Sequence, residues 1–348
     1  MTMTTISTST TTGGTAPSAA LGPDRSPDAT FRPSRPGDDQ FVDLAARIGA
    51  VSARRAADHD RDATFVSEAY DLMRETGYLG LVVPTELGGL GATARQAAFA
   101  QAELARHDGS TSLASTMHLY NCLVQVFRRR AGAPDAEGVL KRVAAEGLVI
   151  ATSGGSDWLW VDTVATPTDE GFVVSGRKHF CSQAPGATVV STSAVVGDPA
   201  PGAEVIHFSV PLAAEGVRLV ETWDTLGMRG TASHDLVFTD VVVPAEKVVG
   251  RRPWGELGGP LRTAVTNFAP VAAATYLGIA AAARDLAVDK VRTGARGTTA
   301  LIAQGTAHRQ IGELDAALRV AWWSVLASLD EIGVDGDIMR ADADAMAT

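Results

Sequence analysis

The chain has 348 residues, of which 45% are hydrophobic and 20% are charged, so it is long enough for two or three soluble domains. Its 30 basic and 40 acidic residues give a formal net charge of −10, which disfavours a nucleic-acid partner. The two cysteines, Cys122 and Cys181, cannot form a disulfide framework, so we expect a cytoplasmic location. The sequence shows neither a signal-peptide pattern nor an apolar run of membrane-spanning length, so we expect no membrane partner.

Residues 1–38 are rich in Thr, Ser, Pro and Gly. Such a segment buries too little apolar surface to offset the entropy lost on ordering, so we predict a disordered extension without a catalytic role. From Phe41 onward apolar residues recur at helical spacing, and Thr93-Ala-Arg-Gln96 has the form of a capping box at a helix start. The sequence therefore predicts an N-terminal α-helical domain over residues 39–147. Two of its helices are expected over residues 112–130 and 136–146.

The pattern changes from helical to extended at Leu148. No ten-residue helical segment interrupts the strands that follow, which favours an antiparallel barrel or sandwich over alternating strands and helices. A dinucleotide-binding glycine fingerprint is absent. We therefore predict a central β-domain over residues 148–252. Its expected strands cover residues 161–166, 172–175, 189–196, 205–210, 217–220 and 236–243.

Helical spacing returns after Arg251, with one long helix expected over residues 261–292 and a second over residues 300–331. Residues 253–348 are therefore predicted to form a C-terminal helical bundle with a frayed tail after Gly333. Two long apolar helices seldom stand alone, so we expect this bundle to be incomplete and completed by another chain or by residues outside the sequence. The predicted fold class is α+β, in three domains.

The most informative stretch lies at the start of the β-domain. A short apolar strand over residues 148–151 ends in a turn of small polar residues, Ser153-Gly-Gly-Ser-Asp157, whose backbone N–H groups could face an anion or a carbonyl-rich ring. Phe180 and Ser182 stand two residues apart in the next strand and therefore share one side of the sheet. This arrangement predicts a site for a flat aromatic cofactor with a phosphate tail.

Three stretches, residues 77–91, 148–183 and 223–244, together resemble the acyl-CoA dehydrogenase family of flavoproteins. With the helices, the resemblance covers about residues 41–330. It implies a homo-oligomeric flavin-dependent oxidoreductase that binds FAD and oxidises an acyl-CoA or another small-molecule acyl thioester across Cα–Cβ, with hydride transfer to the flavin. FMN is the alternative cofactor.

The resemblance also assigns cofactor-binding residues by position. Ala151 and Thr152 match the strand that binds the pyrimidine edge of the flavin. Gly155 and Ser156 match a turn near the cofactor and the carrier arm of the substrate. Phe180 falls where an aromatic side chain covers one flavin face, and Ser182 falls where a hydroxyl approaches the flavin N5. A donor near N5 stabilises the charge that develops there.

Several positions depart from the family pattern. Acyl-thioester dehydrogenation needs a carboxylate base beside the α-carbon, and most members place it on a helix near the C-terminus, which we expect to lie beyond this sequence. A minority place it on the first helix of the bundle, where this chain has Phe268, and Ala269 stands where typical members have Arg. Ser153 and Gly154 replace the usual Glu-Pro.

A branch of the same fold consists of two-component monooxygenases, which react reduced FMN or FAD with oxygen and lack the dehydrogenase base. His118, in Ser115-Thr-Met-His-Leu119, resembles a histidine that some of them place in the α-domain. His118 and Ser182 are therefore our candidate catalytic residues, and a flavin reductase is the partner that this alternative requires. A third alternative is a truncated relative that binds flavin without turnover.

Each assignment also has a structural alternative. Residues 153–157 could form only a tight turn, and Phe180 could be a core residue of its strand. His118 could be a buried histidine with satisfied hydrogen bonds, because it lies on an apolar helix face.

Other polar residues support less specific predictions. Arg229 could bind a phosphate or pair with Asp235, and His234 is expected in a surface turn. The seven histidines show no metal-ligand spacing, so no metal site is predicted.

Overall fold

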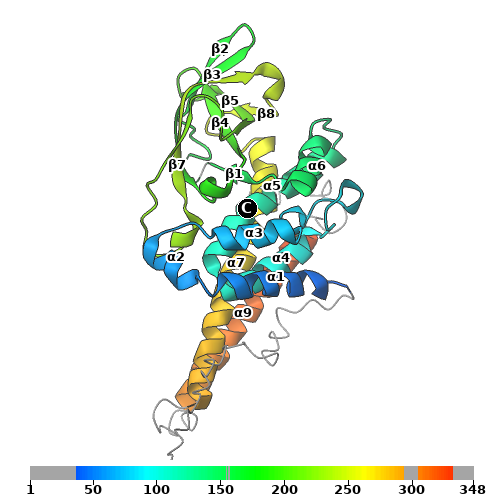
Figure 1. The fold of residues 1–348 in the computed structure, drawn as a ribbon, viewed down its shortest axis with the longest axis vertical. Coiled ribbons are helices and arrows are strands. Elements are labelled where there is room, and N and C mark those ends of the chain that lie inside the picture. The colour runs from blue at the N-terminus through cyan, green and yellow to red at the C-terminus, as the bar shows by residue number, and fades with distance from the viewer. Residues whose placement is uncertain (1–36, 154, 156, 294–304, 332–348) are drawn as a thin grey trace, which may run out of the picture.

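The computed structural model describes residues 37–153, 155, 157–293 and 305–331. A mixed β-sheet lies at one end of the molecule, and the helices pack beneath it, with α7 and α9 extending away from the sheet (Figure 1). The predicted succession of helices, strands and helices is confirmed. Within the predicted N-terminal extension only Gly37 and Asp38 are described, and the predicted tail after Gly333 lies outside the described residues.

The helices that precede the sheet form a layer around an apolar core. The predicted capping box is present: Thr93 Oγ1 accepts from the N–H of Gln96 at 3.2 Å, and Gln96 Oε1 accepts from the N–H of Thr93 at 2.7 Å. Both predicted helices of this region form, although the first begins three residues earlier, where Asp108 caps it. The helices are α1 (Asp39–Ser52), α2 (Ala56–Asp62), α3 (Ser67–Glu75), α4 (Ala94–His107), α5 (Gly109–Arg130) and α6 (Ala136–Glu146).

The described strands form a single sheet in the order β6-β7-β3-β2-β4-β5-β8, and β1 also pairs with β4. The predicted antiparallel pairing is present in five of the strand pairs, but β1 and β2 both run parallel to β4, so the sheet is mixed. The strands are β1 (Ile150–Thr152), β2 (Val164–Thr168), β3 (Gly171–Cys181), β4 (Val189–Val196), β5 (Glu204–Pro211), β6 (Val217–Val220), β7 (His234–Pro244) and β8 (Gly250–Pro253).

The register explains the parallel pairing. Thr152 of β1 lies opposite Ser191 of β4, and Val164 of β2 lies opposite Val195 further along the same strand. β1 and β2 therefore pair with successive parts of the same edge of β4, and residues 153–163 connect them. This loop leaves the sheet beside the helices, where it can reach a ligand.

In the described part of the chain, two long helices follow the sheet, α7 (Gly259–Thr293) and α9 (Gly305–Glu331). α7 is long and apolar enough to cross a membrane, with a mean hydropathy of 1.4 over its most apolar window, but it packs against α4, α5 and α9. A Cβ atom at Gly278 would lie only 2.1 Å from the carbonyl oxygen of Ala102, so glycine allows α7 to approach α4 this closely. α7 is thus the element that joins the helical layers and reaches the sheet.

Candidate functional site

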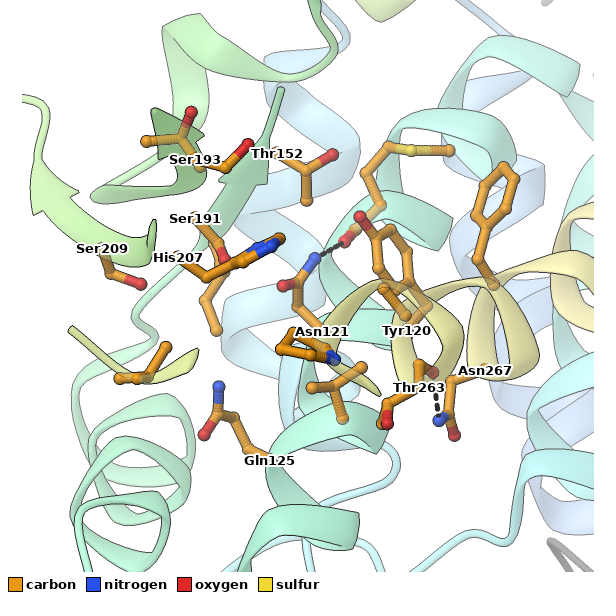
Figure 2. Close-up of a pocket in the computed structure, with 18 of the residues that line it drawn as sticks. Tyr120, Asn121, Gln125, Thr152, Ser191, Ser193, His207, Ser209, Thr263 and Asn267 are labelled. Carbon is orange, nitrogen blue, oxygen red and sulfur yellow. Dashed lines mark hydrogen bonds between the residues drawn. The ribbon is translucent and has the colours of Figure 1, made fainter. Parts of the chain in front are cut away.

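A cavity of about 1150 Å³ lies between the sheet and the helices. Its walls come from the faces of β1, β4 and β5, from α5 and α6, and from the first turns of α7 (Figure 2). The loop after β1 and the end of β3 also contribute, through Trp158, Phe180 and Ser182. The cavity therefore lies where the sequence predicted a cofactor site.

The sheet wall of the cavity is a ladder of small polar side chains. Ser191 lies opposite Thr152 on one side and Ser209 on the other, and Ser193 lies opposite His207. Alternate residues of a strand share a face, so these five side chains line the same wall. The wall offers hydroxyl and imidazole groups and carries no carboxylate, lysine or arginine.

The helix wall mixes aromatic, apolar and amide side chains. Tyr120 of α5 and Phe268 of α7 meet edge to face, with ring centroids 5.3 Å apart. Burial raises the pKa of Tyr120, with Thr152 and Asn121 acting in the opposite direction, so its hydroxyl stays protonated near neutral pH. Oδ1 of Asn267 is buried and has no hydrogen-bond partner, while its amide donates to the carbonyl of Thr263 at 2.8 Å. This unpaired acceptor suits a ligand that brings an N–H or O–H group.

Four of the predicted cofactor residues line the cavity: Thr152, Gly155, Phe180 and Ser182. The side chain of Ala151 instead packs in the core of the sheet, so only its backbone could contact a cofactor. Ser156 lies outside the described residues. Ser182 Oγ is 2.8 Å from Ser233 Oγ, which fixes the hydroxyl at the end of β3.

Phe180 is held away from the protein core. Its backbone has φ +59°, a conformation that is uncommon for a residue other than glycine, and 50% of the residue is exposed. A Cβ atom at Gly155 would lie 3.1 Å from the Phe180 ring, so the predicted turn lies against this ring. The structure thus presents an aromatic ring beside the cavity and does not bury it, which corrects the core-residue alternative.

His118 does not line the cavity. The ring is fully buried between α5 and the chain before the sheet, where Nε2 lies 2.8 Å from the carbonyl of Leu79 and Nδ1 accepts from the N–H of Ile150 at 3.1 Å. Burial lowers its pKa to about 4, so the ring is neutral near pH 7. Both ring nitrogens bond to backbone groups, as expected for a buried histidine with satisfied hydrogen bonds. Its catalytic role remains a prediction that this geometry does not favour.

Two buried cations bond to residues around the cavity, and neither was among the predicted site residues. Lys178 pairs with Asp157 and anchors the loop after β1. Arg252 of β8 is buried and donates to Nε2 of His207 at 3.2 Å. The signal that could have identified His207 is its spacing from Ser209, because two polar residues at alternate positions mark one face of a strand otherwise built from apolar residues.

The Asp235 alternative for Arg229 and the expectation for His234 were both wrong. Arg229 does not pair with Asp235 and instead binds Asp224 at 2.7 Å, while Arg177 binds Asp235 at 2.6 Å. His234 is buried in β7, where its Nδ1 accepts from the backbone of residues 222 and 223 at 3.1 Å. Arg229 therefore holds the segment over residues 224–229 against the end of α2, and His234 holds the segment that follows β6.

Acidic groups are sparse in the cavity. Among the described lining residues the carboxylates are Asp135 and Glu246. Asp135 lies at the start of α6 and is bound by Arg128 at 2.8 Å, and Glu246 is exposed in the short turn after β7. No group of His, Cys, Asp and Glu in the described part of the chain could hold a metal ion. Among the described residues, none next to Thr152 and Ser182 can act as a carboxylate base.

The residues present fit a flavin. An isoalloxazine ring needs a flat apolar contact and neutral hydrogen-bond groups along its polar edge. Phe180 offers the exposed aromatic face, and Thr152, Ser182 and Ser191 offer hydroxyl groups on the adjacent wall.

Comparison with known proteins agrees with this fit. Residues 38–145 match the N-terminal domain of acyl-CoA dehydrogenases, and residues 151–241 match their middle domain. The amino sugar nitrososynthase DnmZ of Streptomyces peucetius is 31% identical over 322 residues, which cover 88% of this chain and 76% of DnmZ. Dibenzothiophene monooxygenase of Rhodococcus erythropolis is 32% identical over 310 residues, which cover 83% of this chain and 72% of that enzyme.

Solved structures agree in fold and cofactor. KijD3 in complex with FMN and dTDP-3-amino-2,3,6-trideoxy-4-keto-3-methyl-D-glucose superposes with a TM-score of 0.76 at 27% identity, over 90% of this chain and 78% of KijD3. FMN-bound TdsC from Paenibacillus sp. A11-2 superposes with a TM-score of 0.73 at 25% identity, over 84% of this chain and 77% of TdsC. The prediction of a flavin is confirmed, with FMN as the flavin in both of these structures. The protein is a flavin-dependent enzyme of the oxidoreductase and oxygenase class, and the chain belongs to the acyl-CoA dehydrogenase family of flavoproteins.

Proposed function

We propose that the protein is the oxygenase component of a two-component flavin monooxygenase, which takes reduced FMN or FAD from a separate flavin reductase. The observation that carries this proposal is a cavity whose cofactor wall fits a flavin but holds no carboxylate base among its described residues. Oxidation of an acyl thioester needs such a base to remove the α-proton. Transfer of one oxygen atom from O2 to a substrate, with two electrons from a reduced flavin and the second oxygen atom leaving as water, does not need it.

The relatives support the same choice. The amino sugar nitrososynthase and the dibenzothiophene monooxygenase are each over 30% identical to this chain, and neither is named as an acyl-CoA oxidising enzyme. Of the two activities predicted from the sequence, the monooxygenase alternative is therefore better supported than acyl-thioester dehydrogenation.

In this proposal some residues of the cavity bind the flavin and others exclude water. When bound, reduced flavin supplies the electrons that activate oxygen for transfer to the substrate. Thr152 and Ser182 would hold the polar edge of the ring, and Phe180 would cover one face. Tyr120 keeps its proton near neutral pH and offers a neutral O–H donor to the reacting region. Met117, Val124 and Phe268 line the helix wall and limit access of water.

The substrate is proposed to be a small molecule with an oxidisable nitrogen, sulfur or ring carbon. The names of the relatives refer to amino sugars and to dibenzothiophene, and TdsC has also been solved with FMN and indole. The cavity of about 1150 Å³ has room for a flavin ring and a second ring system of this size.

We also propose that the protein is a homo-oligomer. Large apolar side chains are exposed along the last two helices, including Tyr276, Leu286, Val320 and Trp323. Monomeric soluble proteins rarely leave so much apolar surface on neighbouring helices in contact with water. Light scattering of the purified protein should give a mass of at least two chains.

One experiment separates the candidate activities. The purified protein is mixed with FMN, NADH and a flavin reductase, and oxygen uptake and products are measured with indole or dibenzothiophene. An oxygenated product that requires the protein, the reductase and oxygen supports the proposal. Anaerobic bleaching of bound FAD by acyl-CoA thioesters would instead show a dehydrogenase. Flavin binding without either reaction would favour the relative without turnover.

A further inference from the structure

The hydrogen bond between Arg252 and His207 determines where the imidazole proton lies. Nε of the guanidinium donates to Nε2 of His207 at 3.2 Å. A guanidinium group has no acceptor, so Nε2 must be unprotonated and the ring proton must be on Nδ1. His207 is thereby held as the neutral tautomer with an Nδ1–H donor.

The guanidinium that imposes this tautomer is itself fixed. Arg252 is 4% exposed and donates to the backbone carbonyls of Trp158, Leu159, Pro253 and Glu256. Burial lowers the pKa of His207 to about 4, and the charges of Arg252 and Lys178 act in the same direction. The ring therefore stays neutral across the physiological pH range.

The Nδ1–H group has no hydrogen-bond partner within the described part of the chain, although His207 lines the cavity. Figure 2 shows the ring projecting from β5 into the space between the sheet and the helix that carries Asn121. Ser193 lies opposite His207 in the register, and Ser209 follows on the same face of β5. Three neutral polar groups thus converge on one part of the cavity.

This group of side chains lies away from the predicted flavin edge. Thr152 lies on β1, which pairs with β4, and β4 in turn pairs with β5, so β5 is two strand spacings from Thr152. Neighbouring strands are separated by about 4.8 Å, so His207 and Ser209 stand roughly 10 to 12 Å from Thr152. Ser182, which the family pattern assigns to the flavin N5, follows β3, and β2 and β4 separate β3 from β5 in the sheet order, so His207 and Ser209 can bind a part of the substrate away from N5.

We propose that His207, Ser193 and Ser209 form a recognition site for an uncharged oxygen acceptor, such as a carbonyl group, at the end of the substrate remote from the reacting atom. This inference rests on the proposed function. His207 is the specificity-determining donor of the site, and Arg252 is the positioning residue that holds its tautomer.

The two buried cations near His207 are both used inside the protein. All hydrogen bonds of Arg252 go to His207 and to backbone carbonyls, so its guanidinium offers nothing to a ligand. Lys178 is committed to Asp157. A ligand at His207 therefore meets a neutral donor and gains no charge from these two buried cations, although the charged side chains of Lys247 and Arg262 also line the cavity.

The test compares two neutral rod-shaped ligands, 4-acetylbiphenyl and 4-isopropenylbiphenyl, which differ by a carbonyl oxygen in place of a CH₂ group. Their dissociation constants are measured by calorimetry on the FMN-bound protein. His207→Phe keeps a ring but removes the donor, so the ratio of the ketone constant to the alkene constant should rise about three- to tenfold. His207→Gln keeps an N–H donor and should leave this ratio within twofold of wild type.

His308→Phe, the same substitution at an exposed position on α9, serves as the matched control and should change neither constant. FMN affinity should be the same in all variants. A ratio that changes less than twofold in His207→Phe, or failure of the wild type to bind the ketone, would overturn the proposal. These equilibria need no oxygen or reductase. A confirmed ratio shift without any oxygenation activity would therefore reject the proposed function and leave the recognition site standing.

Nitrogen-15 NMR of histidine-labelled protein provides a second, ligand-free test. The signals of His207, assigned through their absence in His207→Gln, should show a protonated Nδ1 and an unprotonated Nε2 at pH 7. The opposite tautomer or a charged ring would contradict the arrangement.

Discussion

The backbone N–H of Ile150 donates to Nδ1 of His118 at 3.1 Å, so the first residue of the sheet is bonded to the ring of a helix residue. Nε2 of the same ring meets the carbonyl of Leu79 at 2.8 Å. A neutral imidazole therefore joins the first strand of the sheet to the Tyr78–Gly80 turn, and this requires that the ring remain uncharged.

This contact predicts a loss of stability in acid. The pKa of His118 is about 4 in the folded protein and about 6.5 when unfolded, so between these values the unfolded state binds the additional proton. The contribution of His118 to the free energy of unfolding is fully present above pH 6.5 and decreases as the pH falls toward 4. From pH 7.5 to pH 5 this residue should account for a loss of about 2 kcal/mol in the free energy of unfolding.

Urea unfolding of wild type and His118→Gln at the two pH values measures this contribution. The variant should be less stable at pH 7.5, yet lose about 2 kcal/mol less than wild type on acidification. His308→Gln, at an exposed position, should behave as wild type. An equal loss in wild type and His118→Gln would show that the ring does not carry the effect.

Phe180→Ala should weaken FMN binding. The ring is held beside the cavity by a backbone with φ +59°, and an aromatic contact of this kind contributes about 0.5–1.5 kcal/mol beyond its buried area. The dissociation constant, measured by quenching of FMN fluorescence, should rise at least three- to tenfold. Trp160→Ala is the control, since Trp160 is 60% exposed and does not line the cavity. Unchanged affinity in Phe180→Ala would remove the assignment of this ring to a flavin face.

Lys178→Met should strongly destabilise the fold. Lys178 is 1% exposed and pairs with Asp157, so the substitution leaves a buried carboxylate without its partner, at a cost of about 3–5 kcal/mol. The double variant with Asp157→Leu removes both charges and should recover most of that loss. Chemical denaturation of the three proteins gives the comparison. A double variant no more stable than Lys178→Met would mean that the pair is not the cause.

Gly278→Ala should destabilise the contact between α7 and α4. The added methyl group would lie 2.1 Å from the carbonyl oxygen of Ala102, and relief of this overlap should cost about 1–3 kcal/mol. Gly312→Ala is the matched control on α9, where the added Cβ meets no atom within 4 Å and should stabilise the helix by about 0.5–1 kcal/mol. Thermal unfolding should move in opposite directions for the two variants, and equal shifts would contradict the close approach.

Local patterns predicted several elements to the residue. α6, β4 and β6 have the predicted bounds, and the hydrogen bonds of the Thr93 capping box are present. These features depend on periodicity and on capping within a few residues, which the sequence displays directly. β8 was missed, because Gly250-Arg-Arg-Pro253 has no alternation of apolar and polar residues and is extended only through its pairing with β5.

Part of the site was also predicted from the sequence. Thr152, Phe180 and Ser182 were placed at the cavity because the family pattern carries their positions. His207 was missed although its spacing from Ser209 is visible in the sequence, and the contact that fixes its ring comes from Arg252, 45 residues later. His118 was assigned a catalytic role because its two backbone partners, 39 and 32 residues away in the sequence, could not be seen in the local pattern.

By itself the sequence determined most of the helical and extended segments and the flavoprotein family, and it predicted the strand that faces the cofactor. These follow from spacing and motif, which are properties of neighbouring residues. The tertiary structure decided the parallel pairing of β1 with β4, the neutral state of His118 and the tautomer of His207. Each of these depends on burial and on hydrogen bonds between segments far apart in the chain, and such contacts exist only after the layers have packed.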